Sequence, residues 1–150
     1  MNNDLYAFLS SVREAREEKR RCEWRLERLR DNCENITTVL RDTPGGGSGD
    51  KHKDTALIAL VDAGAELRDR MRFYEERIEA VESFIDGIKD PVSRAILHLR
   101  FCACLTWEDV TEELKSYGVW VSERHVYNLR KRAERDADRK WEEEHDHSNG

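Results

Sequence analysis

Two apolar stripes, whose members are three or four residues apart, occupy most of the first ninety residues. The first stripe begins at Leu5 and ends at Leu40, and the second begins at Leu57 and ends at Ile88. This spacing places residues on one side of an α-helix, and its repetition is typical of a coiled coil. Between the stripes, the proline and glycines of TPGGGSGDKHKD, residues 43–54, end a helix. We therefore expect two long helices that form an antiparallel hairpin.

The stripes are narrow, and Lys19 interrupts the first of them. The first comprises Leu5, Phe8, Val12, Ala15, Cys22, Leu26, Leu29, Cys33, Ile36 and Leu40, and the second comprises Leu57, Leu60, Gly64, Leu67, Met71, Tyr74, Ile78, Val81, Ile85 and Ile88. Because a two-helix hairpin alone buries little apolar surface, we expect a homo-oligomer. Trp24, Phe73 and Phe84 lie off the stripes and are the expected contacts between hairpins. The alternative is a self-contained two-helix coiled coil with a solvated exterior.

The composition and motifs exclude several classes of protein. No apolar run is long enough to span a membrane, and the first residues lack the pattern of a signal peptide, so we expect a cytoplasmic protein. The four cysteines include Cys102-Ala103-Cys104, which lacks the spacing of a structural zinc site. The glycine loop lacks the Lys-Ser/Thr ending of a phosphate loop, which favours a flexible turn over an anion site. We expect no metal, no cofactor and no enzymatic activity.

Three helix-start signals follow the second stripe. Asp90-Pro91 combines a good N-cap with a proline suited to the first helical position, and Thr106 and Ser122 are further N-cap residues. Three short helices with a turn between the last two are typical of a helix-turn-helix. The expected organisation is an oligomerising hairpin over residues 1–88, a DNA-binding domain over residues 89–141 and a disordered tail over residues 142–150.

The helix that starts at Ser122 carries the expected DNA-binding residues. In a helix-turn-helix the final helix enters the major groove, where Arg and Asn can contact guanine and adenine edges. The expected base-reading residues are Glu123, Arg124, His125, Tyr127 and Asn128, and the expected phosphate contacts are Arg130, Lys131, Arg132 and Arg135. The ordinary alternative is an amphipathic helix whose basic face is solvated.

The charge distribution favours double-stranded DNA as a partner. The chain has a net charge of -6. Residues 120–141 contain seven Lys/Arg and four acids, a local charge of +3, so the remainder of the chain carries -9. Positive charge is therefore concentrated at the expected recognition helix, and acidic residues elsewhere limit non-specific binding.

The segments DPVSRAILHLRF, LTWEDVTEEL and VSERHVYNLRKRA resemble region four of bacterial sigma factors. Their combination with a hairpin interrupted by a Pro-Gly-Gly loop is similar to phage and prophage late transcriptional regulators of the RinA and ArpU type. The resemblance implies an all-α, sequence-specific DNA-binding regulator that activates late genes and contacts RNA polymerase. The link LKSYGVWVS is longer than the Leu-Gly-x-Ser turn usual in that family.

Two alternatives remain open from the sequence. Small terminase subunits, which package DNA, also combine helix-turn-helix modules with oligomerising helices, although they usually place the DNA-binding part first. A sigma-like protein-interaction module that binds RNA polymerase or a host factor is the other alternative. Salt-dependent binding to DNA separates the interaction module from the two DNA-binding functions.

Overall fold

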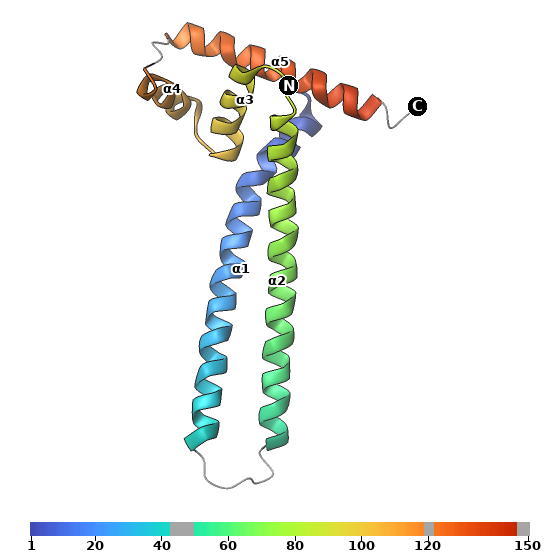
Figure 1. Cartoon of the computed structure of the whole chain (residues 1–150), viewed down its shortest axis with the longest axis vertical. Coiled ribbons are helices and arrows are strands. Elements are labelled where there is room, and N and C mark those ends of the chain that lie inside the picture. The colour runs from blue at the N-terminus through green and yellow to red at the C-terminus, as the bar shows by residue number, and fades with distance from the viewer. Residues whose placement is uncertain (43–49, 119–121, 147–150) are drawn as a thin grey trace. The chain divides into compact units, whose positions relative to one another are not determined.

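The computed structural model describes residues 1–42, 50–118 and 122–146, and the side chains of 36–42 and 50–53 are not among those described. Within these ranges the chain is helical and contains no strand, which confirms the all-α class (Figure 1). The elements are α1 (Asn3–Asp42), α2 (Asp50–Asp86), α3 (Pro91–Leu97), the π-helical turn η1 (His98–Cys102), α4 (Trp107–Ser116) and α5 (Glu123–Asp146).

The chain divides into two units. The first unit contains Met1–Ala15 and Glu76–Gly150, and the second contains Arg16–Glu75. From the stripes, residues 1–88 were instead expected to form one domain. The difference arises because Leu5 and Leu9 of α1, with Val81 of α2, share a hydrophobic core with residues of α3 and α5. The start of α1 and the end of α2 therefore pack with the C-terminal helices.

The second unit consists of parts of α1 and α2 alone. Leu26 of α1 packs beside Gly64 of α2, and a Cβ on the glycine would lie 3.6 Å from Leu26 Cδ1, at ordinary van der Waals distance. Lys19 Nζ lies 3.3 Å from Glu75 Oε1, so the charged residue that interrupts the first stripe forms an ion pair between the helices. α2 already begins at Asp50, inside the predicted 43–54 loop, and residues 43–49 lie outside the described residues.

The core of the first unit contains residues of α1, α2, α3, η1 and α5. The fully buried side chains include Leu5, Leu9, Val12, Val81, Ile85, Ile96 and Leu97, and Ala133 and Ala137 of α5 pack against the same cluster. Leu9 is buried although it does not lie on the predicted stripe. A helix that packs on more than one neighbour buries a wider face than a two-helix seam requires.

The prediction for Phe84 was wrong. This residue was expected to contact another hairpin, but its side chain is only 6% exposed. Its ring centre lies 5.8 Å from that of Phe8 and 5.9 Å from that of Trp141, with both pairs in edge-on arrangements. Aromatic rings favour this geometry, so Phe84 belongs to the core of its own chain. Trp24 and Phe73 remain exposed.

The three predicted helix starts carry N-cap hydrogen bonds. The Asp90 side chain accepts a hydrogen bond from the Val92 N–H at 3.3 Å, at the start of α3. Thr106 Oγ1 accepts from the Asp109 N–H at 3.2 Å, at the start of α4. These bonds satisfy backbone donors that have no partner inside the helix, so the local sequence determines where α3 and α4 begin.

The turn after α4 is only partly described. Gly118 has a φ of +78°, a left-handed conformation that glycine adopts without strain, and this explains the end of α4. Residues 119–121 of the predicted turn lie outside the described residues.

The segment between α3 and α4 departs from a regular α-helix. The Ala103 N–H donates to the His98 carbonyl at 2.8 Å, in the wider hydrogen-bonding pattern of a π-helix. Cys102 is buried, Cys104 is half-buried, and none of the four cysteines forms a disulfide. Within the described ranges, no cluster of His, Cys, Asp and Glu side chains is suited to hold a metal ion.

Candidate nucleic-acid interface

α5 is held on the first unit by one apolar face. Val126 and Ala133 are buried, Leu129 is partly buried, and Ala137 continues the same face. These positions follow steps of three and four, which keep them on one side of the helix. Ser122 Oγ accepts a hydrogen bond from the His125 N–H at 3.2 Å and caps the first turn. Val126, Leu129 and Ala133 therefore anchor α5 through one side of the helix.

The opposite face of α5 is exposed. The five expected base-reading residues, Glu123, Arg124, His125, Tyr127 and Asn128, are all exposed. Arg124 and Asn128 are four residues apart, so their side chains share one face. Lys131 and Arg135 continue this face in further steps of three and four, and both are exposed. We call Arg124, Asn128, Lys131 and Arg135 the outer face of α5.

Two of the expected phosphate contacts share an acidic neighbour. Arg130 Nε lies 2.9 Å from Glu134 Oε1, and Lys131 Nζ lies 3.8 Å from Glu134 Oε2. The Arg130 guanidinium also lies over the indole of Trp107, with Cζ 4.5 Å from the ring centre. Arg130 is thus directed toward α4. The contact with Glu134 was visible in the sequence as an i,i+4 pair, whereas the contact with Trp107 was not.

Arg132 is bound to the start of α3. Its Nε lies 2.7 Å from Asp90 Oδ2. The buried Ser93 hydroxyl lies 2.9 Å from the same oxygen and 2.7 Å from Asp136 Oδ2 of α5. Because a hydroxyl has one proton, Ser93 donates to only one of these carboxylates at a time. This network joins α3 to α5.

The same network lowers the pKa of Asp90. Desolvation raises this pKa, but hydrogen bonds from Ser93 and the Val92 N–H outweigh it, together with the positive charge of Arg132. The pKa therefore lies below its ordinary value of 3.8. The ionised form of Asp90 is thus the form that holds Arg132.

Arg135 is the exception among the four expected phosphate contacts. It is exposed, and within the described ranges no acidic side chain forms an ion pair with it. Arg124 is likewise without an ion pair there. The structure thus separates two arginines that face solvent from Arg130 and Arg132, which are held by other parts of the first unit.

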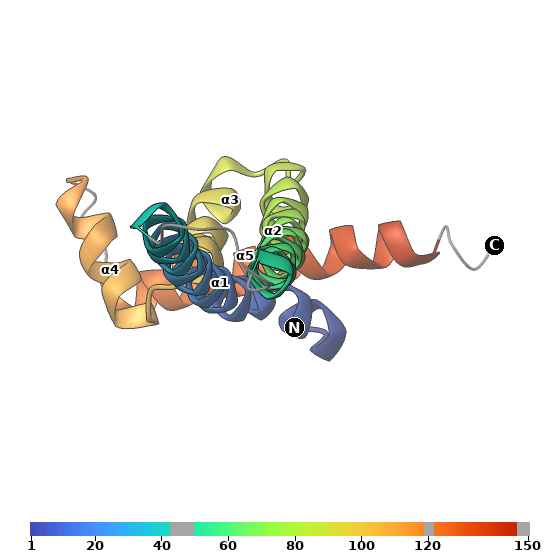
Figure 2. The ribbon, with the colours of Figure 1, turned by 90° about the horizontal axis from the view of Figure 1, so that it is seen from below.

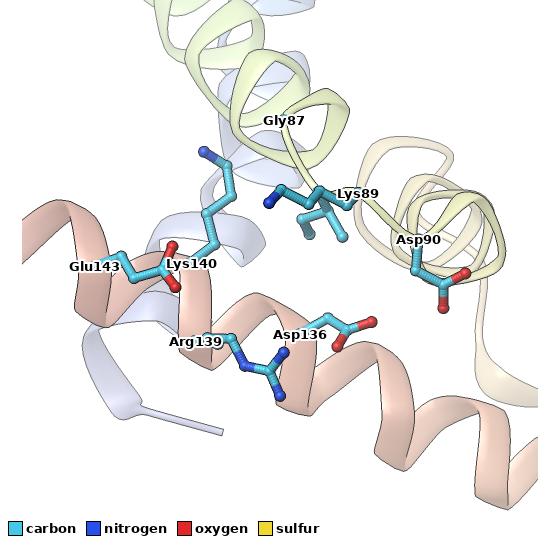
Figure 3. Close-up of a pocket in the computed structure, with 8 residues that line it drawn as sticks. Gly87, Lys89, Asp90, Asp136, Arg139, Lys140 and Glu143 are labelled. Carbon is cyan, nitrogen blue, oxygen red and sulfur yellow. The ribbon is translucent and has the colours of Figure 1, made fainter.

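A cavity of about 340 Å³ lies between the α2–α3 link and the second half of α5 (Figure 3). Lys140 reaches toward Gly87 in this view, and a Cβ at Gly87 would lie 2.6 Å from Lys140 Cε. The charged residues around the cavity are Lys89, Arg139 and Lys140 with Asp90, Asp136 and Glu143. The equal numbers of basic and acidic groups give this cavity no preference for an anion.

The groove between α4 and α5 has a different character. It encloses about 660 Å³, and its rim includes Glu108, Asp109 and Glu112 of α4 with Glu123 of α5. Trp107 and Tyr127 contribute aromatic surface, while Lys115 and Arg130 are its basic residues. The acidic excess repels phosphate, so on electrostatic grounds the outer face of α5 suits DNA better than this groove does.

Comparisons with protein-family models, with curated proteins and with solved structures found no match for this chain. None of the helices in the described ranges is both long enough and apolar enough to cross a membrane.

Proposed function

We propose that this protein is a sequence-specific DNA-binding regulator of transcription that reads DNA with the first turns of α5 and acts as an oligomer. The observation that carries the proposal is the outer face of α5, where Arg124, Asn128, Lys131 and Arg135 are all exposed. The buried face of the same helix anchors it through Val126.

The order of side chains on this face suits a helix that enters the major groove by its N-terminal end. Arg124 and Asn128 lie in the first turns, and their types can form paired hydrogen bonds with guanine and adenine edges. Lys131 and Arg135 follow one and two turns later, where a helix leaves the base edges and meets the backbone. A role in activating phage late genes is the biological setting that the sigma-like motifs suggest.

One observation favours a second candidate, a protein-interaction module. The α4–α5 groove combines the aromatic side chains of Trp107 and Tyr127 with an acidic rim. Such a surface suits a basic protein segment better than a nucleic acid. The two candidates predict opposite results in a DNA-binding experiment.

The test selects preferred sequences from random double-stranded DNA with the full chain and then measures affinity by fluorescence anisotropy. Arg124→Ala and Asn128→Ala should each cost about 1–3 kcal/mol on the selected site and change binding to random DNA little. Val92→Ala, at an exposed position on α3, serves as the matched control and should leave both affinities unchanged.

Circular dichroism of each variant establishes that the helices persist. If selection enriches no sequence, or if Arg124→Ala and Asn128→Ala bind the enriched site as tightly as the wild type, the proposal is wrong. The groove between α4 and α5 then becomes the better candidate site.

A further inference from the structure

Two large aromatic side chains are exposed on the second unit. Trp24 of α1 is 57% exposed and Phe73 of α2 is 60% exposed. Each lies two residues after a stripe position of its own helix, Cys22 for Trp24 and Met71 for Phe73. Two residues turn an α-helix by about 200°, so each ring points away from the neighbouring helix of the pair. Trp24 and Phe73 therefore lie on opposite sides of the two-helix unit. Figure 2 shows the ribbons of α1 and α2 from below.

Each aromatic residue belongs to a larger face. Arg20, Trp24 and Arg28 follow one another in steps of four, and all are exposed; they form the outer face of α1. Arg28 Cζ lies 4.8 Å from the centre of the Trp24 ring. On α2, the exposed residues Ile58, Asp62, Asp69 and Phe73 form the outer face of α2.

The two outer faces carry opposite charges. The charged residues of the outer face of α1 are Arg20 and Arg28, whereas those of the outer face of α2 are Asp62 and Asp69. Within the described ranges, none of Arg20, Asp62 and Asp69 forms an ion pair with another side chain. A basic face with a central tryptophan is therefore complementary to an acidic face with Ile58 and Phe73.

We propose that the partner on these faces is a second copy of this chain, which packs the outer face of α1 against the outer face of α2. This inference rests on the self-association included in the proposed function but does not require α5 to bind DNA. Because the two faces are different and point to opposite sides, the contact is head-to-tail, and each copy keeps one face open for the next. Such a contact builds a ring or a linear array rather than a closed two-fold dimer.

The test uses the full chain without DNA and measures mass by analytical ultracentrifugation. Trp24→Asp disrupts the outer face of α1 and leaves the outer face of α2 unchanged. Phe73→Asp disrupts the outer face of α2 and leaves the outer face of α1 unchanged. Wild-type protein should form species larger than a dimer at micromolar concentration, and each variant alone should be a monomer. An equimolar mixture of the two variants should form a one-to-one dimer, because each variant keeps the face that the other lacks.

Charge reversal tests the same contact without removing an aromatic ring. Arg20→Glu with Arg28→Glu, and Asp62→Lys with Asp69→Lys, should each prevent assembly alone and restore it when the two proteins are mixed. Tyr117→Asp is the matched control, since Tyr117 is 71% exposed in the first unit, and its assembly should equal that of the wild type.

Three results would overturn this inference. They are a monomeric wild-type protein, a single aromatic variant that still assembles alone, and mixed aromatic variants that stay monomeric although circular dichroism shows both to be helical. None of these results concerns the affinity of Arg124 or Asn128 for DNA, so failure of the assembly model and failure of the DNA-binding proposal are distinguishable.

Discussion

Arg132 Nε lies 2.7 Å from Asp90 Oδ2, so a basic residue on α5 is bound to the residue that caps α3. The contact gives Arg132 a structural partner that Arg135, one turn further along the helix, lacks within the described residues. The two arginines are therefore expected to respond differently when DNA binds.

Arg135→Ala should reduce the salt dependence of DNA binding more than Arg132→Ala does. A free guanidinium that neutralises one phosphate contributes about one unit to the slope of log affinity against log salt concentration. Arg132 must first leave Asp90, so its contribution should be smaller. Anisotropy titrations at a series of salt concentrations measure both slopes. An equal or larger change for Arg132→Ala would show that the Asp90 contact does not restrain it on DNA.

Acid should weaken the α3–α5 connection through Asp90. The pKa of Asp90 is lowered in the folded protein, so its contribution to stability is complete above the ordinary value of 3.8 and is lost as the pH falls through the lowered pKa. Urea unfolding followed over this acidic range measures the effect. Asp90→Asn keeps an N-capping side chain but no charge, and it should show a smaller loss of stability on acidification than the wild type. If the stability of the wild type and of Asp90→Asn fell in the same way with pH, the ionised Asp90 carboxylate would not be the group that stabilises the α3–α5 connection.

Ser93→Ala should destabilise the protein by about 1 kcal/mol, with the loss rising toward 3 kcal/mol if the carboxylates stay unsatisfied. Ser93 is 1% exposed, and its hydroxyl lies between Asp90 and Asp136. Ser83→Ala is the matched control, because Ser83 is exposed on α2. Chemical denaturation of both variants provides the comparison, and equal stabilities would remove the proposed role of the network.

Leu9→Ala should destabilise the first unit by about 2–5 kcal/mol, because Leu9 is fully buried and its loss leaves a cavity. Leu29→Ala, in the second unit, should cost less, since Leu29 is only partly buried. Thermal and urea unfolding of each variant measure the difference. A larger loss of unfolding free energy for Leu29→Ala than for Leu9→Ala would contradict this prediction. It would mean that Leu29 is more deeply buried in solution, as it would be if another copy of the chain covered the stripe.

Several local features were predictable because they depend on neighbours in the chain. The stripes predicted two long helices, and Asp90, Thr106 and Ser122 predicted the starts of α3, α4 and α5. The tail was not predicted well: residues 142–150 were assigned to disorder, whereas α5 continues to Asp146, and residues 147–150 lie outside the described part. The stacking of His145 on Trp141, with ring centres 3.9 Å apart, supports this last turn.

The arrangement of the candidate site depended on contacts between distant residues. Periodicity placed Arg130 and Arg132 on a basic helix but carried no information about Trp107 or Asp90, which the fold brings beside them. Phe84 was predicted to contact another hairpin because a heptad pattern considers one partner helix, whereas Phe84 packs against Trp141 of α5 in its own chain. Local sequence thus determined the helices, their caps and the buried stripe of α5, since hydrogen bonding and periodicity act over a few residues. The tertiary structure alone decided which basic side chains are bound within the protein and which remain exposed, because ion pairs and ring contacts join segments that the sequence keeps far apart.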